Sequence, residues 1–272
     1  MKKLALLFIM LSTLYSVLRT PVHAQDFTFK KAFEDYQFSQ GNYNESFSNY
    51  QKYKDAYLKN PTLTLKEDAR KKTLNMLKLR DELQKVYLTA LRMRIKENAG
   101  LTENEKGALF TKIDSEVDWY LKHKGEYQDG DTLDSLFSKS GESENKNKTI
   151  TTQIVHESLF YISLGDEVDL RVIQENIYKN LTDTINIGVA EGKLDINPFN
   201  RWFLDIGDVI KKLIANEGLG KTSIQKMYGQ SVSSPTSAYN TSIEPLESSL
   251  KLLTQFNSFL TEVLTSIKNQ QK

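Results

Sequence analysis

Hydrophobic residues recur every three or four positions along most of this chain, a spacing that predicts helices. The clearest pattern runs from Leu65 to Asn98, where two apolar stripes occupy neighbouring helix faces. The first contains Leu65, Ala69, Met76, Leu79, Leu83, Val86, Ala90 and Met93, and the second contains Leu74, Leu77, Leu88, Leu91 and Ile95. A helix that is apolar on two faces must lie between neighbours to bury both. We therefore expect residues 65–98 to form the central helix of a bundle.

The segment before it, residues 27–60, is rich in aromatic residues at helical spacing. The pattern predicts a hairpin that turns at Gly41-Asn42 and ends before Pro61, because the residue before a proline disfavours helical geometry. The motif Gln40-Gly41-Asn42-Tyr43-Asn44-Glu45-Ser46, followed by Tyr50-Gln51-Lys52, resembles the turn and second helix of a tetratricopeptide repeat. No second copy follows, and such repeats need about three units to stack stably. Residues 33–61 are thus interpreted as one degenerate repeat-like hairpin.

A wider resemblance covers residues 27–101. The shared features are the Tyr-rich segment, Thr64-Leu65 at the start of the long helix, and the short motifs Leu79-Arg80-Asp81 and Tyr87-Leu88 within it. They are similar to the N-terminal part of exported helical proteins from candidate-phylum bacteria. The resemblance implies an exported bacterial protein and brings no catalytic residue.

Helix boundaries are indicated by glycine, proline and capping residues. Gly100 is expected to close the central helix, and Thr102 with Glu105 forms a capping box that opens the next helix at about 103–124. Residues 65–98 carry a net charge of +5 and residues 101–138 a net charge of −5. This balance favours antiparallel pairing of the two helices, although both charged faces could simply be solvated.

Apolar periodicity in the second half of the chain predicts four more helices. They span about 149–164, 166–190 and 198–217, separated by Gly165, Gly192 and Pro198, and then Ile243 to Lys268. The last helix has leucines at heptad spacing and a polar side with few charges, which favours a partner helix over a lipid surface. That partner helix could belong to the same chain or to a second copy, so self-association is one option.

Two polar segments separate the predicted helical regions, and a predicted cleavage site near the N-terminus adds a third boundary. Ser138 to Lys148 and Gln230 to Ser242 lack the apolar period and are predicted to be linkers. The expected organisation is a signal peptide at 1–24, an N-terminal helical bundle at 25–138, a linker at 139–148, a second helical region at 149–229, a linker at 230–242 and a C-terminal helix at 243–272. The predicted fold is an all-α, elongated bundle of long antiparallel helices in two subdomains.

The signal peptide prediction rests on Lys2 and Lys3, the apolar run Leu4 to Leu18, and small residues before a cleavage site after Ala24. The alternative is a retained membrane anchor, for which the apolar run is short. Cleavage removes three basic residues and no acid, which leaves 33 basic and 35 acidic residues. This balance gives no electrostatic reason to bind nucleic acid. We expect a periplasmic or secreted bacterial protein without stable membrane insertion after cleavage.

Several short motifs suggest chemistry, and each lacks a required part. Residues 215–222 match a permissive phosphate-binding loop but follow a helical rather than a strand pattern. His156-Glu157 begins a zinc-protease motif, but Phe160 stands where the second histidine is needed. The acids Asp129, Asp131 and Asp134 lack the glycine and glutamate of a calcium loop and are interpreted as turn residues. His123 and His156 are the histidines left after cleavage, lie far apart in the sequence, and are expected at the surface or core edge.

No catalytic residue, cofactor or metal site is predicted. The chain contains no cysteine, and Glu116 and Asp118 do not share a helix face. The most favoured function is non-catalytic protein interaction or scaffolding in the cell envelope, with an unidentified protein partner. One alternative is glycan or peptidoglycan binding through exposed rings of Tyr36, Tyr50 and Tyr53, although their spacing also suits a hairpin core. A third is an exported hydrolase that uses a carboxylate pair.

Overall fold

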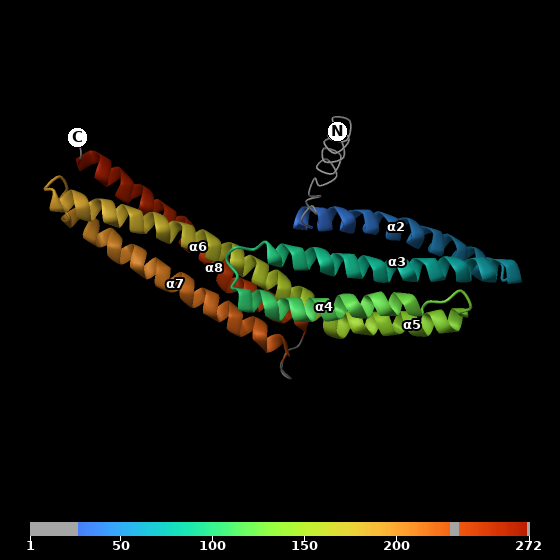
Figure 1. Ribbon diagram of the computed structural model, residues 1–272. Helices are drawn as coiled ribbons and strands as arrows, with labels where there is room; N and C mark the ends of the chain where they lie inside the picture. Colours follow the sequence, from blue (N-terminus) through green and yellow to red (C-terminus); the bar gives the residue numbers. More distant parts are fainter. Residues whose placement is uncertain (1–26, 229–233, 271–272) are drawn as a thin grey trace, which may run out of the picture.

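The computed structural model describes residues 27–228 and 234–270, and this part of the chain is all-α. The signal peptide predicted at 1–24 and residues 230–233 of the second predicted linker lie outside these ranges. The helices are α2 (Phe29–Lys59), α3 (Leu63–Lys96), α4 (Glu103–Glu126), α5 (Leu133–Lys146), α6 (Thr152–Ala190), α7 (Asn200–Gln225) and α8 (Pro235–Gln270). Helices α2 to α5 form one half of an elongated molecule, and α6 to α8 extend into the other (Figure 1). The prediction of an elongated all-α bundle is confirmed.

Helix α3 lies between neighbours, as its two apolar faces predict. It packs against α2 on one side and against α4 and α5 on the other (Figure 1). Fully buried Leu88 and Ile95 join a core with α4 and α6, while Leu77 packs against Leu136 of α5. The predicted pairing with α4 is also present, since Arg92 Nε lies 2.7 Å from Asp114 Oδ1 and Lys124 Nζ lies 2.8 Å from Glu82 Oε2. The capping box of Thr102 and Glu105 is confirmed.

The turn predicted at Gly41-Asn42 is wrong. Helix α2 is continuous from Phe29 to Lys59, and Gly41 lies in its middle. The hairpin in this region is formed by α2 and α3 together, with a short turn at Asn60 to Thr62 between them. Gly41 faces open space, so the helix tolerates it at a cost of about 1 kcal/mol relative to alanine.

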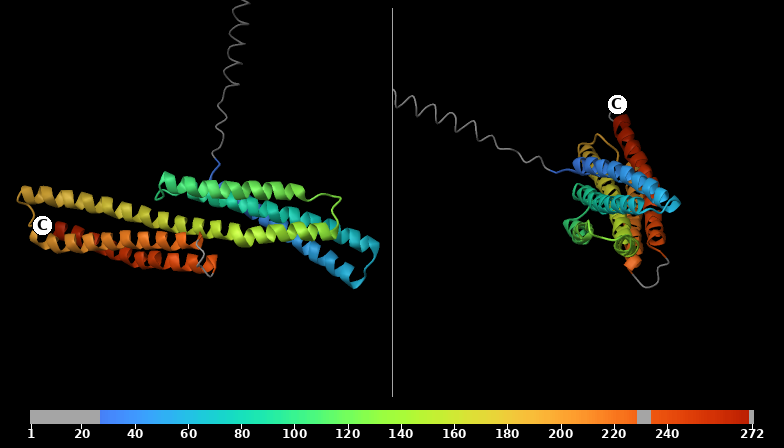
Figure 2. Two further views of the ribbon diagram at one scale, coloured as in Figure 1. Left: turned by 90° about the horizontal axis from the view of Figure 1, so that it is seen from below. Right: turned by 90° about the vertical axis from the view of Figure 1, so that its right-hand side faces the viewer.

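The linker predicted at 139–148 is helical. Helix α5 continues through the π-helical segment Asn147–Thr151 into α6, so that one helical rod runs from Leu133 to Ala190. Figure 2 shows this rod crossing from one half of the molecule to the other. The polar residues that suggested a linker have partners in the fold: Ser143 is buried, and Lys146 Nζ lies 2.7 Å from Glu116 Oε1.

Helices α6, α7 and α8 pack around a second core that includes Phe199, Leu213, Phe256 and Val263. The break predicted at Gly165 and the helix end predicted at 217 are wrong, because α6 continues through Gly165 and α7 runs to Gln225. Gly192, with φ of 67°, ends α6 as predicted. Helix α8 begins at Pro235, earlier than predicted, and buries its apolar stripe against α6 and α7 of the same chain.

None of the helices in the described ranges combines the length and hydrophobicity needed to cross a membrane.

Candidate functional site

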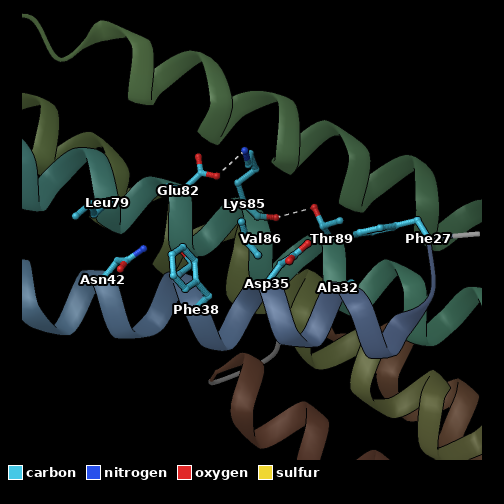
Figure 3. A pocket seen from close by; sticks show the side chains of 11 residues that line it. Phe27, Ala32, Asp35, Phe38, Asn42, Leu79, Glu82, Lys85, Val86 and Thr89 are labelled. Carbon is cyan, nitrogen blue, oxygen red and sulfur yellow. Dashed lines mark hydrogen bonds and ion pairs between the residues drawn. The ribbon is translucent and has the colours of Figure 1, made fainter. Parts of the chain in front are cut away.

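An open groove runs between α2 and α3 on the surface of the first half (Figure 3). Its volume is about 430 Å³. Apolar side chains, among them Ala32, Leu79 and Val86, line it, and Phe27 and Phe38 stand at its edge. Phe38 is 73% exposed. The groove is therefore apolar along its floor and has an aromatic residue held in solvent beside it.

Polar residues surround this apolar floor. Asp35 and Asn42 come from α2, and Glu82, Lys85 and Thr89 come from α3. Lys85 Nζ lies 2.8 Å from Glu82 Oε1, so the two charges lie side by side on α3 (Figure 3). Hydrophobic grooves of this kind can accept the apolar face of an amphipathic helix.

The three tyrosines proposed for ligand contact lie along the α2–α3 hairpin, and all are partly buried. The ring of Tyr36 packs 5.4 Å from that of Tyr87, next to the core around Ala32 and Ala90. Tyr50 packs against the core that contains Leu74 and Leu77. The ring of Tyr53 has Lys72 Nζ 5.4 Å from its centroid. None of the three lines the groove.

A buried polar network lies on the other side of α3. Asp81 is fully buried and accepts hydrogen bonds from His123 Nδ1 at 2.5 Å and Ser143 Oγ at 3.0 Å. Arg80 Nε approaches the same carboxylate at 3.4 Å. His123 stacks on Trp119 with ring centroids 4.5 Å apart. The expectation that His123 lies at the surface or core edge is wrong, because the network holds its side chain inside the bundle.

This network does not form a nucleophilic triad. Ser143 and His123 both bond to Asp81, and no hydrogen bond joins the hydroxyl to the imidazole that would have to remove its proton. The second nitrogen of the ring, His123 Nε2, is buried and has no hydrogen-bond partner within the described residues.

A second polar cluster surrounds the π-helical segment. Thr151, buried at its end, donates to Glu116 Oε2 at 2.8 Å, and the hydroxyl of Tyr120 lies 3.1 Å from Thr151 Oγ1. Lys146 pairs with the same glutamate. Burial raises the pKa of Tyr120 to about 12, so the phenol stays protonated. Glu116 is thus fully engaged in structure, while Asp118 is exposed, and the two do not form a carboxylate pair.

Glu167 of α6 is a buried acid in the second half of the molecule. It lines a cavity of about 240 Å³ between α6 and α8, beside Leu170 and Leu246. Neither carboxylate oxygen has a hydrogen-bond partner in the part of the chain described, since the nearby Ser249 hydroxyl donates to the Pro245 carbonyl oxygen. Burial raises the pKa of Glu167 to about 7.

The raised pKa of Glu167 predicts that stability falls as pH rises. Between the ordinary carboxyl pKa of 4.5 and the folded value near 7, the folded chain holds a proton that the unfolded chain has released. The free energy of unfolding should therefore decrease from pH 5 to pH 8, with Glu167 contributing about 2 kcal/mol to the change. Urea unfolding of the wild type and Glu167→Gln at several pH values measures this contribution. The free energy of unfolding of Glu167→Gln should rise relative to that of the wild type as pH rises, whereas that of the exposed control Glu244→Gln should not. Parallel pH profiles for the wild type and Glu167→Gln would contradict the prediction.

The remaining sequence motifs have structural roles or lack the needed geometry. Residues 215–222 lie within α7, so no phosphate-binding loop is formed. Phe160 is a fully buried core residue, and His156 stacks on Tyr239 with centroids 5.1 Å apart. Asp131 accepts from the backbone N–H of Gln128 in the turn before α5, as interpreted from the sequence.

No family model, curated protein or solved structure matches this chain.

Proposed function

We propose that this is a non-catalytic binding protein that acts outside the cytoplasm and holds an amphipathic helix of a partner protein in the groove between α2 and α3. The observation that carries the proposal is the solvent-exposed Phe38 beside an apolar floor that no helix of the described chain covers. The export part of the proposal rests on the signal-peptide pattern in residues 1–24.

The shape of the α2–α3 pair supports a helical partner. Two long helices side by side leave a groove that runs along their length, and a third helix buries such a groove efficiently. Phe27 and Phe38 would pack on the apolar face of that helix, and Asp35, Glu82 and Lys85 would lie near its charged edges. Aromatic side chains that become buried against a partner supply much of the binding energy in protein complexes.

Replacement of Phe38 by alanine should weaken partner binding by about tenfold or more, because an aromatic anchor that becomes buried in an interface contributes about 2 kcal/mol or more. Phe137→Ala is the matched control, since Phe137 of α5 is 77% exposed and does not line the groove. Neither side chain is part of the core, so both variants should fold.

The partner is first identified by a photoreactive phenylalanine analogue placed at position 38 or at position 137 in producing cells. A protein that crosslinks from position 38 and not from 137 is then purified, and its affinity is measured for the wild type and both alanine variants. Equal crosslinking from both positions, or equal affinity for Phe38→Ala and the wild type, would overturn the proposal. Retention of peptidoglycan fragments that is lost in Tyr36→Ala or Tyr50→Ala would replace it with glycan binding.

A further inference from the structure

The end of α4 and the adjoining face of α5 bring one histidine and two glutamates together. A potential ligand atom from each of His123, Glu126 and Glu142 lies within 4.8 Å of those from the other two. His123 and Glu126 are three positions apart on α4 and so share a helix face. Glu142 belongs to the neighbouring α5. The group therefore depends on the packing of two helices.

One ring nitrogen of His123 is held by a hydrogen bond, and the other has no partner within the described residues and could bind a ligand. The Nδ1 atom lies 2.5 Å from the fully buried Asp81 carboxylate, and when Nδ1 donates to this acceptor the neutral ring carries its lone pair on Nε2. The side chain is only 3% exposed, and Nε2 is one of the buried polar atoms that lack a hydrogen-bond partner within the described chain. An imidazole oriented by a carboxylate behind it is the usual arrangement of a metal-binding histidine.

Neither glutamate side chain takes part in an ion pair within the described residues, although Lys139 Nζ donates to the Glu126 carbonyl oxygen. The nearby lysines each pair with another acid: Lys124 with Glu82, Lys139 with Asp131 and Lys146 with Glu116. Both glutamates are exposed. Their side chains can therefore rotate to shorten the separation between ligand atoms to the roughly 3.4 Å that tetrahedral coordination requires.

We propose that His123 Nε2, Glu126 and Glu142 bind a divalent transition-metal ion, with Asp81 as the hydrogen-bond partner that orients the histidine. One imidazole and two carboxylates suit zinc, with bond lengths of about 2.0–2.2 Å, and the nitrogen ligand disfavours magnesium and calcium. Three protein ligands leave one tetrahedral position for water. The ion joins α4 to α5 and removes the unfavourable burial of an unpaired ring nitrogen.

Zinc titration of the full, tag-free chain tests the proposal by calorimetry and by thermal unfolding. The wild type should bind one Zn²⁺ at this site, and its Tm should rise by several degrees with added Zn²⁺ and return when a chelator is added. Glu126→Gln and Glu142→Gln should each weaken binding by about tenfold or more while leaving the metal-free Tm unchanged. Glu45→Gln, an exposed change on α2, should bind zinc as the wild type does.

A spectroscopic measurement identifies the ligand atom. In imidazole-resolved ¹⁵N NMR spectra, Zn²⁺ should shift the Nε2 resonance of His123 and leave Nε2 of His156 in place. The proposal is overturned if the wild type does not bind Zn²⁺, or if binding persists unchanged in Glu126→Gln and Glu142→Gln. A zinc-induced shift at His156 alone would also contradict it.

Discussion

Asp81→Ala is expected to lower the free energy of unfolding by about 3–5 kcal/mol, because breaking a buried ionic network leaves its other members unpaired. Asp81 is the common acceptor for His123 and Ser143, and the Arg80 guanidinium lies beside it. Alanine removes the acceptor from buried donors and leaves a void in the packed layer between α3, α4 and α5. A loss of this size is a large part of the 5–15 kcal/mol that stabilises a typical domain.

Chemical unfolding followed by far-ultraviolet circular dichroism measures this loss. Asp118→Ala, an exposed aspartate of α4, should change stability by less than about 0.5 kcal/mol. Asp81→Asn keeps the side-chain volume and an acceptor oxygen for Ser143, so its loss should be smaller than that of alanine. Nearly equal stability of Asp81→Ala and Asp118→Ala would show that the network contributes little to the fold.

The central helix could be predicted because its signal is entirely hydrophobic. Two apolar stripes along residues 65–98 require neighbours on both sides, and α3 has them. The segment 139–148 could not be predicted in the same way, because a polar residue was interpreted as an exposed one. Ser143 is buried through its bond to Asp81, 62 positions away in the sequence. Such long-range polar partners leave no local period in the chain.

In the candidate sites too, residues at local helical spacing could be predicted from the sequence, and partners from distant helices could not. The apolar residues of the groove between α2 and α3 follow helical spacing, but the turn predicted at Gly41 hid the single long helix that presents Phe38. The proposed metal ligands combine a visible pair, His123 and Glu126 at a spacing of three, with Glu142 from the next helix. Only the pair could have been recognised from the sequence. Asp81, which orients the histidine, is 42 positions away.

Glycines gave the most misleading sequence signal, because they were interpreted as helix breaks. Gly165 lies inside α6 for a packing reason: a Cβ atom there would come within 2.1 Å of Asn98 Oδ1. The Asn98 side chain instead donates to the Ile162 carbonyl oxygen at 3.1 Å and to Asp166 Oδ1 at 2.8 Å. The turn between α3 and α4 is thus held directly against the α6 backbone, and this contact joins the two halves of the molecule.

This contact predicts that an alanine at Gly100, which lies in it, destabilises the protein, whereas an alanine at Gly107, which lies outside it, does not. A Cβ atom on Gly100 would lie 1.9 Å from the Gly165 carbonyl oxygen and 2.9 Å from the backbone nitrogen of Asp169. No rotamer change relieves a clash with backbone, so Gly100→Ala should cost about 3 kcal/mol or more, at or above the upper end of the usual overpacking range. Gly107→Ala in α4 is the matched control, because its Cβ would meet nothing within 4 Å.

Denaturant unfolding of both variants against the wild type tests the prediction. Gly107→Ala should raise the free energy of unfolding by up to about 1 kcal/mol, since alanine replaces glycine in an exposed helix interior. Gly100→Ala should lower it, and hydrogen exchange should show the faster opening in the turn between α3 and α4 and in the facing part of α6. If Gly100→Ala instead stabilises the protein as Gly107→Ala does, the turn between α3 and α4 does not rest on the α6 backbone.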